Sequence, residues 1–145
     1  ESFRTPLIIR WPAVIKPGMV NSDPVMNIDI AETLLDAAHV KVPGEMQGMS
    51  MLPFLEGKHP DGWRQAVYYH YYESGGEHNV AKHIGVLAGR YKLIWFYENK
   101  EWELYDLQKD SLELHNVYND QAYRATGDSL KHILQAQMNK FKDHL

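Results

Sequence analysis

The sequence predicts an α+β fold in which a four-stranded antiparallel sheet packs against a C-terminal helix. Four short segments between residues 66 and 105 are rich in aromatic and aliphatic residues, and polar turns separate them. From about residue 120 the apolar residues recur with the period of a helix. Several consecutive strands followed by one helix are typical of an antiparallel sheet that is covered on one face.

The first part of the chain predicts only one strand and one helix. The apolar run at residues 7–11 indicates a short strand. A helix is expected over residues 29–39, with Asp29 as its N-cap and Glu32 at the acidic position of a capping box. One strand and one helix cannot close a core, so we predict that residues 1–43 are the end of a larger α/β domain. The apolar stripe of this helix would consist of Ile30, Thr33, Leu34, Ala37 and Ala38.

Residues 44–62 predict an irregular linker, because this stretch holds four glycines and two prolines. Residues 63–145 would then form the second domain. We expect its strands at residues 66–72, 84–87, 91–96 and 102–105, and a loop over residues 107–119. The terminal helix would bury a stripe formed by Tyr123, Leu130, Ile133, Leu134, Met138, Phe141 and Leu145.

Composition excludes several classes of function. The formal net charge of -4 comes without a basic cluster, which argues against a nucleic-acid partner. No apolar run approaches the roughly 20 residues of a membrane-spanning helix. The chain has no cysteine, so it has no disulfide and no thiolate metal site, and either a reducing or an oxidising compartment fits. The sequence starts at Glu1 without a signal-like segment, which is typical of a truncated or cleaved chain.

Several motifs, taken in order, resemble the C-terminal part of the sulfatases. The runs RTPLIIRWP at 4–12 and NIDIAETLLD at 27–36 resemble a stretch late in the catalytic domain, and MQGMSMLP at 46–53 resembles the turn that follows it. The C-terminal subdomain of the family is similar to HIGV at 83–86, RYKLI at 90–94 and ELYDL at 103–107, followed by Asp110, Glu113 and Asn116. The chain departs from the family where Glu32 and Ser111 replace prolines and Leu87-Ala88 replaces Arg-Thr.

The resemblance implies a parent enzyme of the formylglycine-dependent, arylsulfatase-like family in the alkaline-phosphatase-like superfamily. Such an enzyme hydrolyses sulfate esters, here of a sulfated carbohydrate, and is commonly exported. Its formylglycine and its calcium ion belong to an N-terminal catalytic domain, which would be the main partner of this chain. The sequence contains no nucleophile motif and no Asp-Asp metal pair, so we assign it neither catalytic residues nor metal ligands. We expect it to form one wall of the substrate cleft and to be inactive alone.

His78 and His83 are the candidate substrate-binding residues. They flank the end of a polar loop with two glycines, and in related sulfatases a histidine-bearing loop of the small domain reaches the rim of the active site. The alternative is that both histidines bind only backbone or solvent. A zinc site is disfavoured, because His70 is the only nearby third ligand. Alternation along the strand should place two of Tyr68, Tyr69, Tyr71 and Tyr72 in the core and two on the other face, where they could line a carbohydrate platform.

Two other functions stay open at the level of sequence. A phosphodiesterase or phosphonate hydrolase of the same superfamily would make similar demands on a metal site. A stand-alone carbohydrate-binding or assembly module would need no chemistry at all. Without the large domain, the strand at 7–11 and the helix from Asp29 would expose apolar faces, so we expect the isolated chain to self-associate, for instance by strand exchange.

Overall fold

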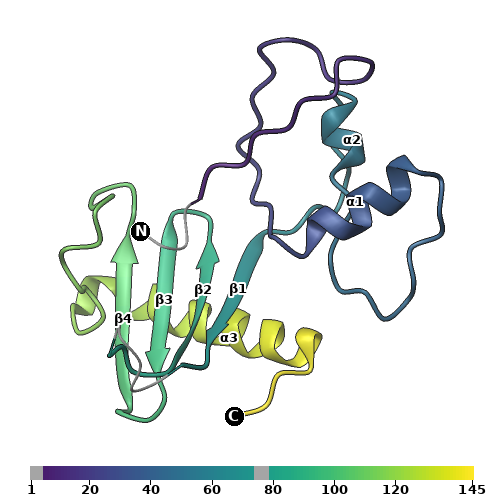
Figure 1. The fold of residues 1–145 in the computed structure, drawn as a ribbon. Coiled ribbons are helices and arrows are strands. Elements are labelled where there is room, and N and C mark those ends of the chain that lie inside the picture. The colour runs from purple at the N-terminus through teal and green to yellow at the C-terminus, as the bar shows by residue number, and fades with distance from the viewer. Residues whose placement is uncertain (1–4, 74–78) are drawn as a thin grey trace. The chain divides into compact units, whose positions relative to one another are not determined.

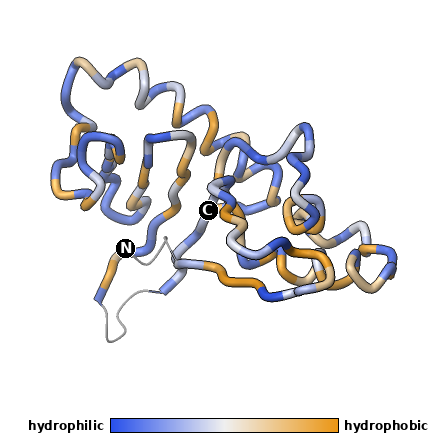
Figure 2. Tube along the Cα trace, turned by 90° about the horizontal axis from the view of Figure 1, so that it is seen from above, coloured by the Kyte–Doolittle hydropathy of each residue, from blue (hydrophilic) through white to orange (hydrophobic). Residues whose placement is uncertain are grey.

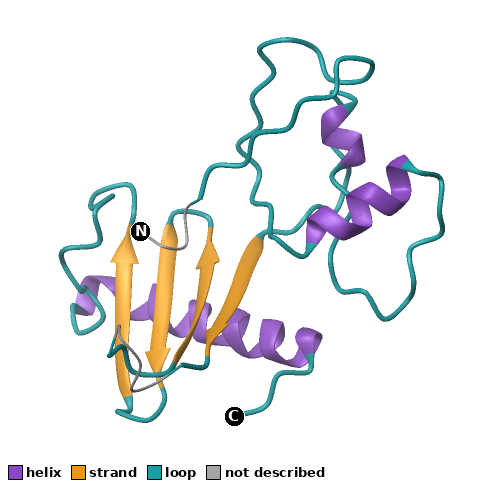
Figure 3. Ribbon diagram, in the orientation of Figure 1, coloured by secondary structure: helices purple, strands orange, loops and turns teal. Residues whose placement is uncertain are grey.

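The computed structural model describes residues 5–73 and 79–145, so the candidate residue His78 lies outside the described residues. The chain divides into two compact units, Glu1–Arg64 and Gln65–Leu145. The first unit contains the helices α1 (Asp29–Ala37) and α2 (Leu52–Leu55), and the rest of its described residues are loops and turns, as Figure 3 shows. None of the described helices combines the length and the apolar character that a membrane crossing requires.

The second unit is a four-stranded antiparallel meander backed by one long helix (Figure 1). The strands follow one another in the order of the sequence, and each pairs with the next. Gly89, with a φ of 56°, and Lys100, with a φ of 58°, lie in the two tight connections, where the left-handed backbone conformation is needed. The elements of this unit are β1 (Ala66–Tyr71), β2 (His83–Ala88), β3 (Tyr91–Phe96), β4 (Glu101–Asp106), the 3-10 helix η1 (Gln121–Tyr123) and α3 (Arg124–Phe141).

The core of the second unit lies between the sheet and α3. Alternate strand residues point toward the helix, which presents its apolar stripe to them, and Figure 2 colours the trace by this hydropathy. The α+β fold predicted from the sequence is confirmed, with each strand boundary within one residue of its expected position. The buried side chains of this core are those of Ala66, Tyr68, Ile84, Val86, Leu93, Leu104, Leu130, Leu134 and Met138.

The strand expected over residues 7–11 does not form. Residues 5–11 have no regular secondary structure, and the described part of the first unit contains no strand that could pair with them. A strand needs such a partner, because its backbone hydrogen bonds are made between strands. Pro12 instead begins a turn in which the backbone N–H groups of Val14 and Ile15 donate to the carbonyl oxygen of Trp11, at 2.9 and 2.8 Å.

The capping role predicted for Asp29 and Glu32 is also wrong. The N-cap of α1 is Ile28, and Asp29 is the first helical residue. Its fully buried carboxylate accepts the N–H groups of Met26 and Met49, at 2.7 and 2.8 Å, and forms an ion pair with Arg64. Glu32 accepts the N–H of Gly48 at 2.6 Å. Both carboxylates therefore stabilise contacts with segments that are distant in the sequence.

Residues 44–62, expected to be a linker, are part of the first unit. Ser50 donates its hydroxyl to Asp36 at 2.6 Å, and the N–H of Met51 donates to the Thr33 hydroxyl at 2.8 Å. A small apolar cluster of Met51, Phe54 and Trp63 completes the packing of this segment. The boundary between the two units accordingly lies at residues 64–65.

Candidate functional site

The sheet face opposite α3 carries a cluster of aromatic rings around His83. Tyr68 faces the helix, where its ring stacks on that of Phe141 with centroids 5.9 Å apart, so its neighbour Tyr69 points to the opposite face. On that face the His83 ring lies 5.4 Å from the ring of Tyr69, 5.1 Å from that of Tyr71 and 4.9 Å from that of Phe96. We call these four residues the His83 cluster. Tyr69 and Tyr71 belong to β1, His83 to β2 and Phe96 to β3. Antiparallel pairing places Tyr71 directly opposite His83.

The hydrogen bonding of His83 fixes its chemistry. Its Nδ1 lies 2.9 Å from the carbonyl oxygen of Ala81, and a carbonyl only accepts, so Nδ1 carries the proton. In the neutral imidazole Nε2 is then an acceptor, and in the protonated form it is a second donor. The half-buried ring thus offers one nitrogen for a hydroxyl, amide or anionic oxygen of a ligand.

Gly85 makes room for the ring of Tyr69. A Cβ at this position would lie 2.3 Å from Cε1 and 2.7 Å from Cζ of Tyr69, far inside van der Waals contact. The Tyr69 ring can therefore lie across β2 only because its register partner has no side chain. Burial, together with the nearby carboxylates of Glu113 and Glu103, raises the pKa of Tyr69 above its ordinary value, so its hydroxyl stays protonated.

A polar group of side chains continues the same face toward β4. The buried Lys92 forms an ion pair with Glu113 at 2.5 Å, and Tyr105 donates its hydroxyl to Glu103 at 3.0 Å. Burial and the bond to Glu103 raise the pKa of Tyr105. At the other border of the cluster, Lys82 pairs with Glu98 at 3.0 Å. The His83 cluster is thus bordered by charged groups that already have partners.

The helix side of the sheet holds a second histidine. His70 Nδ1 donates to the Asp143 carboxylate at 2.7 Å, and His70 Nε2 lies 3.1 Å from the hydroxyl of Tyr97. His70 faces α3 and His83 faces away from it, so the two rings do not share one metal ion. Among residues 5–73 and 79–145, no three side chains of His, Asp or Glu come together as metal ligands.

The four tyrosines alternate between the two faces, but only one of them, Tyr68, is in the core, because Tyr72 is 64% exposed. Tyr68 points to the helix side and Tyr69 and Tyr71 to the other, while Tyr72, just past the end of β1, stacks on His70 with centroids 3.7 Å apart. Sequence reasoning missed Phe96, which completes the cluster. The β2–β3 register, in which Ile84 pairs with Trp95, was the signal that could have placed Phe96 beside His83.

The family-like motif near the end of the sheet has a structural role. The Asn116 side chain accepts the N–H groups of Leu104 and Tyr118, both at 3.0 Å, and donates to the Trp102 carbonyl at 3.1 Å. Asp110 accepts the N–H of His115 at 2.7 Å. These bonds fold the loop after β4 back against the strand.

The sequence matches the family model described as N-sulphoglucosamine sulphohydrolase, C-terminal, over residues 1–140. The chain belongs to this sulphohydrolase family. The resemblance to the C-terminal part of the sulfatases is thereby confirmed.

Similar proteins and solved structures give finer detail. The chain is 44% identical over 147 aligned residues to an N-acetylglucosamine-6-O-sulfatase of Bacteroides thetaiotaomicron, an alignment that covers 99% of this chain and 26% of that protein. A solved structure in complex with its substrate D-glucosamine-2-N,6-O-disulfate superposes with a TM-score of 0.90 and 42% identity, over 94% of this chain and 28% of the other. The chain therefore spans about a quarter of the length of these proteins.

The fold is also shared with a phosphonate monoester hydrolase from Silicibacter pomeroyi. That structure superposes with a TM-score of 0.78 and 25% identity, over 90% of this chain and 28% of the other. The fold of this chain thus also occurs in a protein named for a different ester chemistry.

Proposed function

We propose that this chain is the C-terminal part of a sulfatase that removes sulfate from a sulfated carbohydrate. The observation that carries the proposal is the 44% identity, over nearly the whole chain, to an N-acetylglucosamine-6-O-sulfatase. The substrate class follows from that relative and from the disulfated glucosamine bound in the similar structure.

In this proposal the His83 cluster forms part of one wall of the substrate cleft. The half-buried aromatic rings of Tyr69, Tyr71 and Phe96 offer an apolar surface to the face of a sugar ring. His83 Nε2 would bind a hydroxyl or sulfate oxygen, and His78, which precedes β2 in the sequence, is the second proposed substrate-binding residue. A hydrogen bond to a charged sulfate oxygen is stronger than one to a neutral oxygen, and it is stronger in such a partly desolvated position than in water.

The reactive groups would belong to an N-terminal catalytic domain that precedes this chain in the whole enzyme. A formylglycine would supply the nucleophile there, and a calcium ion would stabilise charge on the sulfate oxygens. This chain offers no residues for either group in the proposal. Its contribution is to bind and orient the sugar, which raises the rate by positioning alone.

The role of His83 can be tested in the whole enzyme with a glucosamine-6-sulfate substrate. His83→Ala should lower kcat/KM about tenfold or more, through both KM and kcat, because a hydrogen bond that binds and orients the sugar is lost. His132→Ala, which removes an exposed histidine from α3, should leave kcat/KM unchanged. Equal kcat/KM values for wild type and His83→Ala would contradict the substrate-binding role.

The location of the chemistry can be tested with the isolated chain. Purified alone, it should release no sulfate from an aryl sulfate, whereas the whole enzyme should. Turnover by the isolated chain, at a rate that resists further purification, would show that the reactive groups are not in a separate domain.

A phosphonate or phosphate ester hydrolase is the second candidate, and the superposition on the Silicibacter enzyme favours it. The whole enzyme should be assayed in parallel with a sulfate monoester and a phosphonate monoester of the same alcohol. We expect a kcat/KM at least about a hundredfold higher for the sulfate ester. A preference for the phosphonate ester would replace the first candidate by the second.

A further inference from the structure

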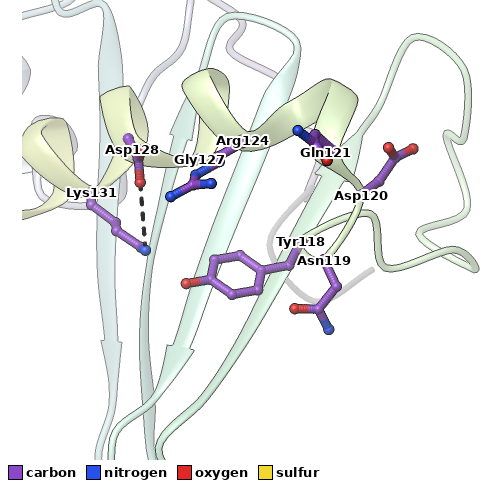
Figure 4. A pocket seen from close by; sticks show the side chains of 8 residues that line it. All are labelled: Tyr118, Asn119, Asp120, Gln121, Arg124, Gly127, Asp128 and Lys131. Carbon is purple, nitrogen blue, oxygen red and sulfur yellow. Dashed lines mark ion pairs between the residues drawn. The ribbon is translucent and has the colours of Figure 1, made fainter.

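A hollow of about 370 Å³ lies at the beginning of α3, well separated in the sequence from His83. Figure 4 shows that its walls are the first two turns of α3 and the loop that leads into them. The volume lies near the lower end of the range of about 300–1,000 Å³ that is typical of ligand pockets. A ligand of one or two sugar rings is therefore the size that would fit.

One side of the hollow is lined by Tyr118, whose ring is the first of three stacked aromatic rings. The Tyr118 ring lies parallel to that of Trp102, with centroids 5.8 Å apart, and Trp102 stacks on Trp95 at 5.2 Å. The Lys131 ammonium group lies 4.9 Å from the Tyr118 centroid and 5.1 Å from that of Trp102. These contacts hold the Tyr118 ring and the Lys131 charge in place without a ligand, so both groups are preorganised.

The remaining lining side chains are polar and exposed. Asn119 and Gln121 contribute two amides, which donate to and accept from hydroxyl groups equally well. An aromatic ring next to several amides suits a carbohydrate better than an apolar ligand, because a sugar presents an apolar ring face and a hydroxyl-rich edge.

A guanidinium group in the lining, unpaired within the described part of the chain, indicates an anionic ligand. The lining contains two carboxylates, but Asp120 accepts the N–H of Ala122 at 2.9 Å as the cap of η1, and Asp128 faces Lys131 at 3.8 Å. Arg124 makes no ion pair with any residue in the described ranges 5–73 and 79–145. Its planar guanidinium group has paired donors that match two oxygens of a sulfate group. The formal charges of the lining sum to zero, two carboxylates against two cations, but Arg124 is the charged lining side chain whose donors are not taken by another side chain of the described residues.

We propose that this hollow binds a sulfated sugar, with Arg124 on the sulfate, Tyr118 against the ring and the amides of Asn119 and Gln121 on the hydroxyls. The choice of a sulfated ligand rests on the proposed function, while the site itself rests on its geometry and charge. Such a site would hold part of a sulfated chain against the C-terminal unit.

The test is a titration of the 145-residue chain with glucosamine 6-sulfate, followed by the NMR shifts of backbone amides. Saturable shifts are expected at residues 118–131, with an affinity at least about fivefold weaker for unsulfated glucosamine. Arg124→Gln should weaken the binding about tenfold, because a charge-assisted pair is lost. Lys140→Gln removes one positive charge from the last turn of the same helix and should have no effect.

Three results would overturn the site: no saturable shift at residues 118–131, the same affinity for inorganic sulfate as for the sulfated sugar, or unchanged binding by Arg124→Gln. The second would reduce the hollow to a simple anion site. The failure of the proposed function gives a different pattern. If the whole enzyme cleaves no sulfate ester but the Arg124-dependent shifts are seen, the proposed function is wrong and the site is supported. If the whole enzyme cleaves sulfate esters but the shifts are absent, the site is wrong and the proposed function is unaffected.

Discussion

The arrangement of the His83 cluster depends on the missing side chain of Gly85. A Cβ at this position would lie 2.3 Å from the Tyr69 ring, which is itself in contact with His83. Gly127 offers a natural comparison, because a Cβ there would meet only Cδ2 of Leu104 at the ordinary distance of 3.8 Å. Both glycines belong to the second unit, but a side chain would clash with a neighbour only at Gly85.

Gly85→Ala and Gly127→Ala should change stability in opposite directions. Gly85→Ala should lower the free energy of unfolding by about 1–3 kcal/mol, since the Tyr69 ring must move or the strand must shift. Gly127→Ala should raise it by up to about 1 kcal/mol, because alanine is the better helix former and fits without a clash. Urea unfolding followed by far-ultraviolet circular dichroism measures both. Loss of stability of equal size in the two variants would mean that the contact with Tyr69 is not the cause.

At the scale of elements, the end of α3 is held to β1 by one carboxylate. The side chain of Asp143, only 12% exposed, accepts the hydroxyl of Tyr68 at 2.6 Å and Nδ1–H of His70 at 2.7 Å. Lys142, with a φ of 55°, ends the helix and turns the chain so that Asp143 reaches the strand. Burial acts to raise the pKa of Asp143, but the hydrogen bonds from Tyr68 and His70 outweigh it and lower the pKa below its ordinary value of 3.8.

Asp143 should therefore make the second unit sensitive to acid. Because the folded pKa is lower than the unfolded value, the stabilisation is fully present above about pH 3.8 and is lost as the pH falls through the folded pKa. Asp143→Asn should be less stable than wild type at neutral pH, and the difference should shrink in acid. Urea midpoints at pH 7 and pH 3 provide the measurement, and Asp128→Asn, at a carboxylate 62% exposed, is the matched control. A difference that is independent of pH would refute the role of the Asp143 charge.

The elements of the second unit could be predicted because their signals are local. The alternation in β1 to β4 and the stripe on α3 are visible within windows of a few residues, and the turns between them contain glycine or polar residues. The first unit was harder, since its contacts join distant segments. Asp29 looks like an N-cap when only its neighbours are considered, but its ion-pair partner Arg64 is 35 positions away in the sequence.

The candidate site was predictable to a similar degree. The residue types and the loop composition singled out His83, and the period of a strand placed Tyr69 and Tyr71 on one face. Phe96 and Gly85 were not assigned, because their roles follow from the register between strands, which the residue pattern of a single strand does not give. The hollow at Arg124 depends in the same way on the loop bonded back by Asn116.

At the scale of the whole molecule, the first unit buries polar groups of α1 and exposes apolar ones. Asp29 and Glu32 are 0% and 3% exposed, whereas Ile30 and Leu34 on the same helix are 43% and 65% exposed. Ile8 and Val20 are exposed as well, at 90% and 87%. Exposed apolar side chains in such number usually mark a surface that contacts another protein or domain. The proposed N-terminal catalytic domain is the partner that would cover them.

The isolated chain should therefore self-associate through its first unit. Sedimentation velocity over a range of concentrations should show a concentration-dependent shift to species larger than the 16.8 kDa monomer. Leu34→Gln and Ile8→Gln should each weaken the association, because they reduce the apolar surface that drives it. Leu112→Gln removes a side chain that is 67% exposed in the second unit and serves as the control, with no expected effect. If the wild-type chain sediments as a single monomer at every concentration, these residues do not form an association surface. The argument that another domain covers α1 would then be lost.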